Sequence, residues 1–360
     1  MFREAIDRMA PYVPGEQPRP GQRLIKVNTN ENPYPPSPRV RRAIVKAAAG
    51  DGLRLYPRPF ADDFVAAAAR LYRVPRSMIL AGNGSDELLA MLFRAVVNPG
   101  DVVAYPSPTY TLYDTLAAVA EARVAPITYG RDFVLPLDEL VRARAALTIV
   151  CNPNAPSGTL IPTATLARLA QLIKPRLLVV DEAYVDFADH NALSLVRSCD
   201  NVAVLRSLSK SFSLAGMRLG LCFARPPVIE GLFKVKDSYN LSRIAQAAGA
   251  AALDDAAWAM RNVQRVRATR RAAEAALRAI GFEVQTSAAN FVLARLPGVD
   301  LAGVVAALRR RGILVRYFAT PMLLDAIRVT IGKPAEMKAL LRELKPLVAK
   351  MAARTGNGAA

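Results

Sequence analysis

Short apolar runs dominate the middle of the chain. Between residues 101 and 224 they read DVVAYPSP, EARVAPITYG, ALTIVCNPN, RLLVVDEAY, NVAVLRSLSK and LGLCFA. Runs of Val, Leu and Ile without polar alternation are typical of strands that are buried on both faces. Because these runs alternate with stretches of helical spacing, the pattern predicts an α/β fold whose large domain has a mostly parallel sheet flanked by helices.

The two ends of the chain follow other patterns. The proline-rich segments APYVPGEQPRPG and NENPYPPSP predict an extended N-terminal arm. Helical spacing occurs at 39–50 and 62–74, and as one long Ala/Arg helix over roughly 244–280. The remainder mixes short strands and helices, as in a smaller α+β domain. We therefore predict an arm with part of the small domain at 1–55, a large domain at 56–265 and a small C-terminal domain at 266–360.

Bulk features exclude several classes of protein. No apolar run approaches the roughly 20 residues of a membrane span, and the N-terminus lacks the apolar region of a signal peptide, so a cytoplasmic location is expected. The three cysteines show neither paired nor metal-type spacing, which fits buried thiols in a reducing compartment. The single histidine, His190, disfavours a histidine metal site and a Ser-His-Asp triad. We expect no metal.

The formal net charge of +18 has three interpretations. It could indicate a nucleic-acid surface, arginines spread over solvated helical faces, or a field that captures small anionic substrates. Basic residues in stretches such as RVRATRRAAEAALRAI alternate with Ala and Leu, without the interleaved aromatics that single-strand binding favours. We therefore expect small-molecule substrates, and neither nucleic acid nor membrane as a partner.

Polar stretches follow several of the predicted strands. They are AGNGSDE, CNPNAPSG, DEAY and SLSK. In open α/β sheets the ligand lies beyond the carboxyl ends of the strands, so these stretches are expected to share one site. GNGSDE precedes a helical run, where free backbone N–H groups and the helix dipole attract an anion. The alternative is an ordinary N-cap at Ser85 or Asp86.

Two charged residues come at strand ends. Asp181 follows RLLVV, where a buried carboxylate needs a positive partner such as a protonated ring nitrogen; an ordinary strand-end acid is the alternative. Lys210 follows VAVLRSLS, where partial desolvation would lower its pKa and supply a neutral amine that attacks carbonyls. Ser207, Ser209 and Arg218 are residue types that bind phosphate, through hydroxyl donors and a guanidinium that can bind two oxygens. Together these residues indicate pyridoxal 5′-phosphate as the cofactor.

The order of the motifs NENPYP, GNGSDE, PTY, NPNAPSG, DEAY, SLSKSFSLAGMRLG, VRYF and IRVTIG resembles the fold-type I pyridoxal-phosphate aminotransferases. Within them it is most similar to the histidinol-phosphate aminotransferase family, from about Tyr12 to the last predicted helix. The resemblance implies a transaminase of histidine biosynthesis that interconverts histidinol phosphate and 2-oxoglutarate with imidazole-acetol phosphate and glutamate.

The resemblance also implies roles for single residues. Lys210 would carry the cofactor as a Schiff base and shuttle a proton, Asp181 would hold the pyridinium proton, and Tyr184 would hydrogen-bond the phenolic oxygen. Tyr110 would stack on the ring. The phosphate cradle would consist of Ser85, Asp86, Ser207, Ser209 and Arg218.

Substrate contacts and the quaternary structure follow from the same resemblance. Arg328 would bind the carboxylate of the amino acid, and Arg316 the phosphate of the second substrate. Tyr12 and Asn32 would line the substrate pocket from the arm. Tyr56 would reach the phosphate of the neighbouring subunit's cofactor, which implies a homodimer with shared active sites.

One stretch departs from the family pattern. NPNNPTG is replaced by NPNAPSG, so Ala155 stands where an asparagine would touch the phenolic oxygen of the cofactor. Either Asn154 makes this contact instead, or Tyr184 makes it alone. The replacement of threonine by Ser157 is a mild change.

Other functions fit parts of the pattern. An aromatic amino-acid aminotransferase or a threonine-phosphate decarboxylase of the same fold would share the cofactor residues and differ in the substrate contacts. A basic nucleic-acid-binding protein on this scaffold would need no lysine that reacts with a carbonyl.

Overall fold

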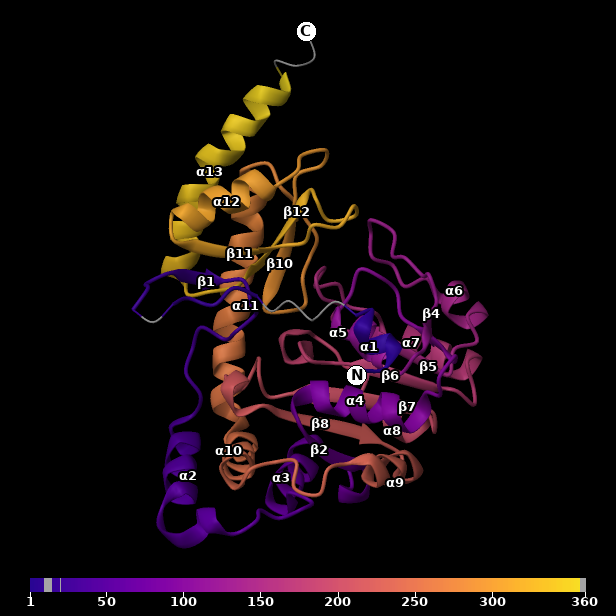
Figure 1. The fold of residues 1–360 in the computed structure, drawn as a ribbon. Helices are drawn as coiled ribbons and strands as arrows, with labels where there is room; N and C mark the ends of the chain where they lie inside the picture. Colours follow the sequence, from indigo (N-terminus) through magenta and orange to yellow (C-terminus); the bar gives the residue numbers. More distant parts are fainter. Residues whose placement is uncertain (10–14, 20, 357–360) are drawn as a thin grey trace.

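The computed structural model describes residues 1–9, 15–19 and 21–356, which form two sheets with their helices (Figure 1). The larger sheet has the strand order β2-β8-β7-β6-β5-β3-β4. Its strands are β2 (Ile79–Asn83), β3 (Val102–Ala104), β4 (Arg123–Val124), β5 (Leu147–Cys151), β6 (Leu177–Asp181), β7 (Val202–Ser207) and β8 (Leu219–Ala224). The pairs from β7 to β4 are parallel and β8 is antiparallel to both its neighbours, which confirms the predicted mostly parallel sheet.

Helices cover both faces of this sheet, and the strands are buried because successive side chains enter two different cores. Val150 and Val180 belong to the core beneath α3 (Asp62–Tyr72), α6 (Leu137–Arg142), α7 (Thr163–Leu172), α8 (Leu195–Ser198) and α10 (Arg243–Asp254). Ile149 and Val179 belong to the opposite core, beneath α4 (Gly84–Val96), α5 (Leu112–Val119) and α9 (Pro226–Val235). This arrangement explains why the strands read as continuous apolar runs.

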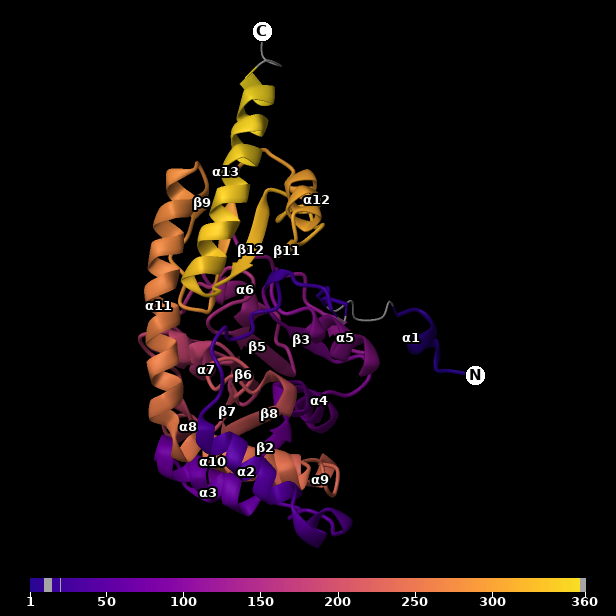
Figure 2. The ribbon, with the colours of Figure 1, turned by 90° about the vertical axis from the view of Figure 1, so that its left-hand side faces the viewer.

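The smaller sheet has the order β1-β11-β12-β10-β9. Its strands are β1 (Ile25–Val27), β9 (Glu283–Val284), β10 (Phe291–Arg295), β11 (Ile313–Tyr317) and β12 (Ala326–Thr330), accompanied by α12 (Ala302–Arg310) and α13 (Pro334–Gly356). Strand β1 comes from the N-terminal arm and pairs in parallel with β11. This part is the α+β domain that the sequence predicts. The proposed domain limits stay predictions; the limit at 265 falls inside α11 (Ala256–Ala279), which runs beside both parts (Figure 2).

The prediction of one helix over 244–280 is wrong. The stretch forms two helices, α10 and α11, that are separated at Asp255, whose backbone is not helical (φ −119°, ψ 38°). The Asp255 carboxylate accepts a hydrogen bond from the Ser37 hydroxyl, at the start of α2 (Pro38–Ala48). This tertiary contact overrides the helical spacing of the local sequence, because α2, α3 and α10 pack together. The short elements are α1 (Glu4–Asp7), η1 (Gly50–Arg54), η2 (Arg76–Met78), η3 (Val185–Phe187) and η4 (Ala215–Met217).

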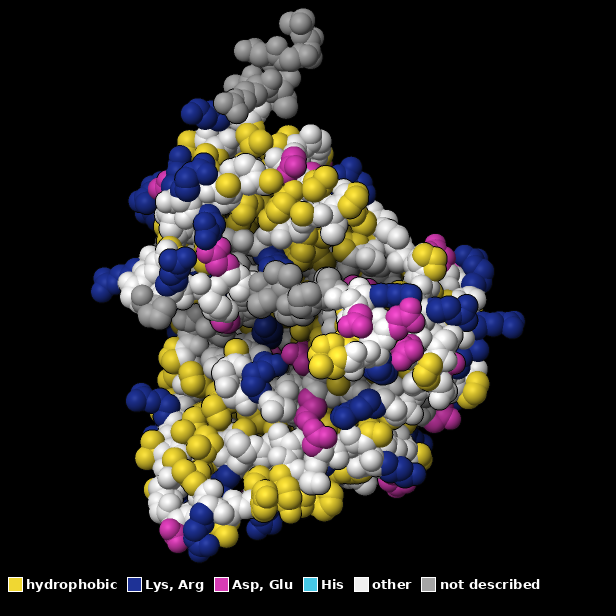
Figure 3. All heavy atoms as spheres, viewed as in Figure 1, with side chains coloured by type: hydrophobic (Ala, Val, Ile, Leu, Met, Phe, Trp, Pro, Cys, Tyr) yellow, Lys and Arg dark blue, Asp and Glu magenta, His cyan; other side chains and the backbone are white. Residues whose placement is uncertain are grey.

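The surface charges, the cysteines and the helix lengths bear on the predictions from composition. Lys and Arg side chains are spread over the face in Figure 3 and interspersed with Asp and Glu. Cys151, Cys199 and Cys222 are buried and form no disulfide. Within the part of the chain that the structure describes, no helix is long and apolar enough to cross a membrane.

Candidate active site

A cavity of about 240 Å³ lies at the carboxyl ends of β6 and β7, against the small sheet. Its walls come from the arm, from the start of α4, from residues 109–111, from the ends of the two strands and from the small domain. Elements that lie far apart in the sequence therefore meet here, as expected for a sheet whose polar stretches follow its strands.

Asp181 is the last residue of β6 and is almost fully buried. The Tyr113 hydroxyl donates to its Oδ2 at 2.7 Å, and the Ala183 N–H donates to its Oδ1 at 3.2 Å. Burial raises the pKa of Asp181 to about 6, although these hydrogen bonds oppose the shift. Both donors are neutral, and none of the described Lys or Arg side chains forms an ion pair with this carboxylate. The site thus retains an acidic group that can accept from a cation.

Lys210 lies three residues beyond the end of β7. Burial, and after it the nearby charge of Arg328, lowers the pKa of Lys210 to about 8. Its Nζ is 3.5 Å from the Thr29 carbonyl oxygen and 5.6 Å from the centre of the Tyr184 ring. Asn32, which was predicted to line the substrate pocket, instead donates to the Lys210 carbonyl oxygen at 3.0 Å and so fixes the backbone that carries the amine.

A buried charged network lies behind the strand ends. Arg206 donates to Glu182 at 2.8 Å and to Asp186 at 3.0 Å, and the Ser211 hydroxyl also donates to Asp186. Glu182 follows Asp181 directly, and Ser211 is likewise the next residue after the lysine. This network was not predicted from the sequence. An arginine inside the apolar run VAVLRS was the available signal, since such a charge needs an acidic partner.

The start of α4 forms a cradle of polar groups. Gly84 has φ +81°, and a Cβ there would lie 2.6 Å from Nη2 of Arg218, so glycine leaves room for the guanidinium. That guanidinium pairs with Asp86 at 2.9 Å and reaches the Ser209 hydroxyl at 3.3 Å. The cavity wall here includes Ser85, Asp86, Ser207, Ser209 and Arg218, which are the predicted phosphate ligands. The described residues contain no cluster of His, Cys, Asp and Glu suited to a metal ion.

Tyr110 and Tyr184 both line the cavity. The Tyr110 hydroxyl donates to Asp86 at 3.2 Å. The Tyr184 hydroxyl accepts from Nδ2 of Asn30 at 3.1 Å, and its ring meets Phe291 edge-on at 5.0 Å. Burial raises the pKa of Tyr184 to about 12, so it is a protonated hydrogen-bond donor at neutral pH.

Asn154 does not face the cavity. Its Oδ1 accepts from Thr109 at 2.9 Å, and its Nδ2 donates to Ser157 at 3.0 Å and to the Pro108 carbonyl oxygen at 3.3 Å. Because both amide hydrogens are used within the protein, the structure gives this side chain no donor for a ligand. Ala155 is the residue of this stretch that lines the cavity.

The predicted substrate residues lie in different places. Arg316 and Arg328 both line the cavity, on β11 and β12. Tyr12 lies outside the described residues. Tyr56 is 78% exposed, is not part of the cavity wall and stacks on Tyr239 with ring centres 4.5 Å apart.

Two further residues were missed. Tyr113 holds Asp181 and comes one helical turn after Tyr110, a spacing that could have identified it. Asn30 is the first asparagine of the same NENP stretch from which Asn32 was selected. Nothing in the local pattern distinguishes the two asparagines, because only the tertiary fold decides which one faces Tyr184.

Comparisons with known proteins agree with this geometry. The family model for aminotransferases of class I and II matches residues 22–344. Histidinol-phosphate aminotransferase 1 of Trichormus variabilis is 43% identical over 347 residues, which cover 96% of this chain and 99% of the relative. Histidinol-phosphate aminotransferase of Citrifermentans bemidjiense is 45% identical over 346 residues, with 96% and 98% covered.

Among solved structures, histidinol-phosphate aminotransferase of Sinorhizobium meliloti in complex with pyridoxal-5′-phosphate superposes with a TM-score of 0.89 at 27% identity, covering 97% of this chain and 98% of that one. The matches extend over both sheets and the cavity between them. The chain therefore belongs to the aminotransferase class I and II family and, within it, to the histidinol-phosphate aminotransferases.

Proposed function

We propose that this chain is a pyridoxal-phosphate-dependent transaminase of histidine biosynthesis. It exchanges an amino group between histidinol phosphate and 2-oxoglutarate, giving imidazole-acetol phosphate and glutamate. The observation that carries the proposal is one cavity that combines Lys210 and Asp181 with two arginines, Arg316 and Arg328. The names of the similar proteins support the substrate.

The residues present fit the cofactor. Asp181 is buried against neutral donors and can accept from a protonated ring nitrogen. Lys210 has a lowered pKa, and the polar cradle at the start of α4 suits a phosphate. When bound, pyridoxal phosphate supplies an aldehyde that takes up an amine and a ring that withdraws electrons from the α-carbon of the substrate.

The protein groups supply positioning and proton transfer. Lys210 would hold the cofactor covalently and would move the proton at the substrate α-carbon, which its lowered pKa favours near neutral pH. Asp181 would keep the proton on the ring nitrogen, and Tyr184 would donate to the phenolic oxygen. Tyr110 would pack on the ring, while Arg218 and the serines at the strand end would hold the phosphate.

The two small-domain arginines bind the anionic groups of two different substrates. Arg328 binds the α-carboxylate of glutamate, and Arg316 binds the phosphate of histidinol phosphate, because a planar guanidinium suits both anions. Tyr12, from the arm, stays a predicted contact to this substrate.

We also propose a homodimer with shared sites. Leu53, Leu55, Tyr56 and Phe60 are all more than half exposed, which is unusual for large apolar side chains gathered in one short segment. A second copy of the chain would cover them and bring Tyr56 to the phosphate of its partner's cofactor. A cytoplasmic location and the absence of a nucleic-acid partner stay predictions from the sequence.

A spectroscopic half-reaction tests the substrate. The purified protein loaded with pyridoxal phosphate is mixed with histidinol phosphate, glutamate or phenylalanine, and the change in cofactor absorbance is followed. Rapid conversion by the first two and not by phenylalanine is expected. Equal conversion by phenylalanine would indicate an aromatic amino-acid aminotransferase. Release of carbon dioxide from threonine phosphate would indicate the decarboxylase. A colourless protein without a borohydride-reducible adduct on Lys210 would reject the transaminase altogether.

A further inference from the structure

Every polar atom of Asn30 takes part in a hydrogen bond. Its backbone N–H donates to the Thr330 hydroxyl at 2.9 Å, that hydroxyl donates to Oδ1 of Asn30 at 2.9 Å, and the Asn30 carbonyl oxygen accepts from Asn290 at 2.9 Å. The residue is 1% exposed and has a left-handed backbone with φ 57°, which asparagine tolerates better than most residues. The remaining polar atom, Nδ2, donates to the Tyr184 hydroxyl.

The orientation of this amide follows from the donors around it. The Thr330 hydroxyl accepts from the Asn30 N–H and has one hydrogen of its own. If Oδ1 and Nδ2 of Asn30 exchanged places, the hydroxyl hydrogen of Thr330 would face the NH₂ group of the amide. The Tyr184 hydroxyl would then face the amide oxygen. The observed orientation satisfies every group, so Nδ2 faces Tyr184.

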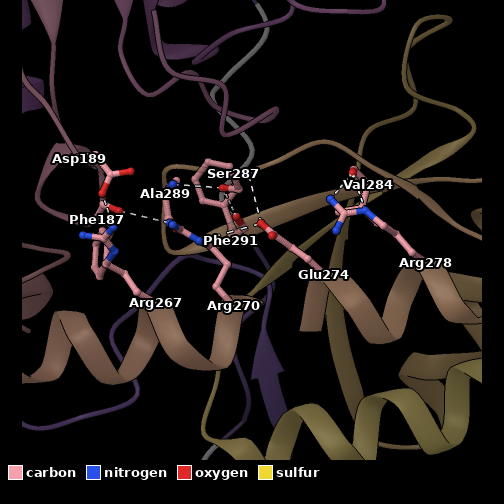
Figure 4. A network of polar contacts seen from close by, with 10 residues as sticks. All are labelled: Phe187, Asp189, Arg267, Arg270, Glu274, Arg278, Val284, Ser287, Ala289 and Phe291. Carbon is pink, nitrogen blue, oxygen red and sulfur yellow. Dashed lines mark hydrogen bonds and ion pairs between the residues drawn. The ribbon is translucent and has the colours of Figure 1, made fainter. Parts of the chain in front are cut away.

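Residues 287–291, which contact Asn30 through Asn290, are anchored by α11 (Figure 4). Arg270 donates to the Ala289 carbonyl oxygen at 2.6 Å, and Glu274 accepts from the Ser287 N–H at 3.1 Å. The Ser287 hydroxyl accepts from the Ala289 N–H and donates to the Phe291 carbonyl oxygen at 2.6 Å. These bonds fix a tight turn over residues 287–291.

This turn presents the two residues that fix the asparagine and the tyrosine. Asn290, between Ala289 and Phe291, donates to the Asn30 carbonyl oxygen, and the Phe291 ring supports Tyr184 edge-on. Asn30 and Tyr184 are therefore held in one rigid frame, which keeps the bond between their side chains at a fixed direction.

This bond determines where the hydroxyl hydrogen of Tyr184 points. The oxygen accepts from Asn30, so the single hydroxyl hydrogen must find another acceptor. Among the described residues no protein acceptor takes it, and Tyr184 lines the cavity. Ala155, on the same wall, has no donor to offer.

We infer that Asn30 is a positioning residue that aims the Tyr184 hydroxyl hydrogen into the cavity and so compensates for the amide missing at Ala155. The inference rests on the proposed function, because the acceptor of that hydrogen is the phenolic oxygen of pyridoxal phosphate. Asn30 does not touch the reacting atoms. It acts through Tyr184, in place of a second direct donor.

Two substitutions at Asn30 test the inference. Asn30→Asp keeps the size of the side chain but offers an acceptor, so the Tyr184 hydroxyl turns away from the cavity. Asn30→Gly removes the amide and tolerates the left-handed backbone. Both are expected to raise the dissociation constant for pyridoxal phosphate by roughly tenfold, the usual effect of losing a hydrogen bond to a charged group. They should also raise the midpoint pH of the absorbance change of the bound cofactor, because the phenolate loses its donor.

Matched variants separate this role from simple loss of structure. Asn201→Asp replaces another buried amide, which donates to the Ala170 and Arg176 carbonyl oxygens, and should lower stability without moving the midpoint pH. Ala155→Asn, added to Asn30→Gly, should recover most of the affinity and change little on its own. In Tyr184→Phe, further substitution of Asn30 should have no additional effect.

The outcomes are distinct. Unchanged affinity and midpoint pH in folded Asn30→Gly would overturn the inference, and so would an equal shift in Asn201→Asp or an additive effect in Tyr184→Phe. Failure of the proposed function would show elsewhere, as absent cofactor binding or absent turnover in the unsubstituted protein.

Discussion

Arg316 and Arg328 are directly opposite each other on the antiparallel strands β11 and β12, and both line the cavity. Like charges at opposite positions of a strand pair repel each other and reduce stability. Arg328 donates to the Asn28 carbonyl oxygen at 3.1 Å, and Arg316 lies over the Phe318 ring at 5.3 Å. Both side chains are positively charged, so an anionic substrate bound between them would reduce the repulsion.

Replacing Arg316 should increase the stability of the ligand-free protein and weaken its activity toward histidinol phosphate. Arg316→Gln is expected to raise the free energy of unfolding of the ligand-free protein by up to about 1 kcal/mol, because one of the opposed charges is gone. The same change should lower kcat/KM for histidinol phosphate by roughly 10- to 100-fold, the effect of a lost charged hydrogen bond. Urea unfolding and steady-state kinetics measure the two effects.

The control is Arg310→Gln, which removes an exposed charge on α12 and should alter neither quantity. Equal losses of activity toward histidinol phosphate and phenylalanine would contradict the assignment of Arg316 to the phosphate.

Lys210 should react with carbonyl and amine-directed reagents at unusually low pH. Its pKa of about 8 lies below the ordinary 10.5, so the folded protein binds fewer protons than the unfolded chain between these values. The contribution of this lysine to stability therefore rises with pH across that window. Labelling of Lys210, followed by mass spectrometry, should increase through about pH 8.

Arg328→Gln serves as the comparison, because it removes the second cause of the shift. Its labelling profile should move to higher pH. A profile for the unsubstituted protein centred near the ordinary value would show that the amine is not desolvated.

Much of this site could be predicted from the chain because its groups follow strands. Asp181 ends one apolar run and Lys210 lies shortly beyond another, and parallel topology brings such positions to one edge. Local signals pointed to Tyr113 and Arg206 as candidates, but the partners of Asn30, Tyr113 and Arg206 could not be predicted, since each contact joins residues more than 20 positions apart. Asp255 interrupts a helical pattern for the same reason, through its contact with the arm.

The buried Asp181 carboxylate lowers the stability of the cofactor-free protein near neutral pH. Its pKa of about 6 exceeds the ordinary 3.8, so the folded state binds the proton more tightly and stability falls as pH rises between these values. Above pH 6, the Asp181→Asn apoprotein should therefore unfold at a higher urea concentration than the unsubstituted apoprotein. Its free energy of unfolding should be greater by no more than about 3 kcal/mol. The difference should shrink toward pH 4.

In the loaded enzyme the same substitution should abolish most activity, because the ring nitrogen loses its acidic partner. A stability difference independent of pH would mean that the carboxylate is not responsible for it.

The network behind the strand ends should stabilise the Lys210 segment. Ser211→Ala removes only the hydroxyl that donates to Asp186 and leaves the Arg206–Glu182 pair intact. We expect a loss of about 1 kcal/mol in the free energy of unfolding and weaker cofactor binding, since the backbone next to Lys210 is less restrained. Ser198→Ala is the control, because its hydroxyl makes only long contacts, at 3.5 Å to the Leu195 carbonyl oxygen and at 3.8 Å to the Cys199 sulfur. If both variants bind the cofactor equally well, the network has no role in positioning the lysine.

Tyr56 offers a test of shared sites. It is exposed and outside the cavity wall of its own chain, so its predicted contact with a cofactor phosphate requires a second subunit. Tyr56→Phe and Lys210→Ala should each be impaired as pure dimers. In a hybrid dimer one site has both substitutions and the other has neither, because the two residues come from different subunits. An equal mixture that is allowed to exchange subunits should therefore recover about a quarter of full activity, as random pairing of a two-fold dimer gives. Subunit exchange without any recovery would place Tyr56 and Lys210 in unrelated roles, and a monomer in light scattering would exclude the shared site directly.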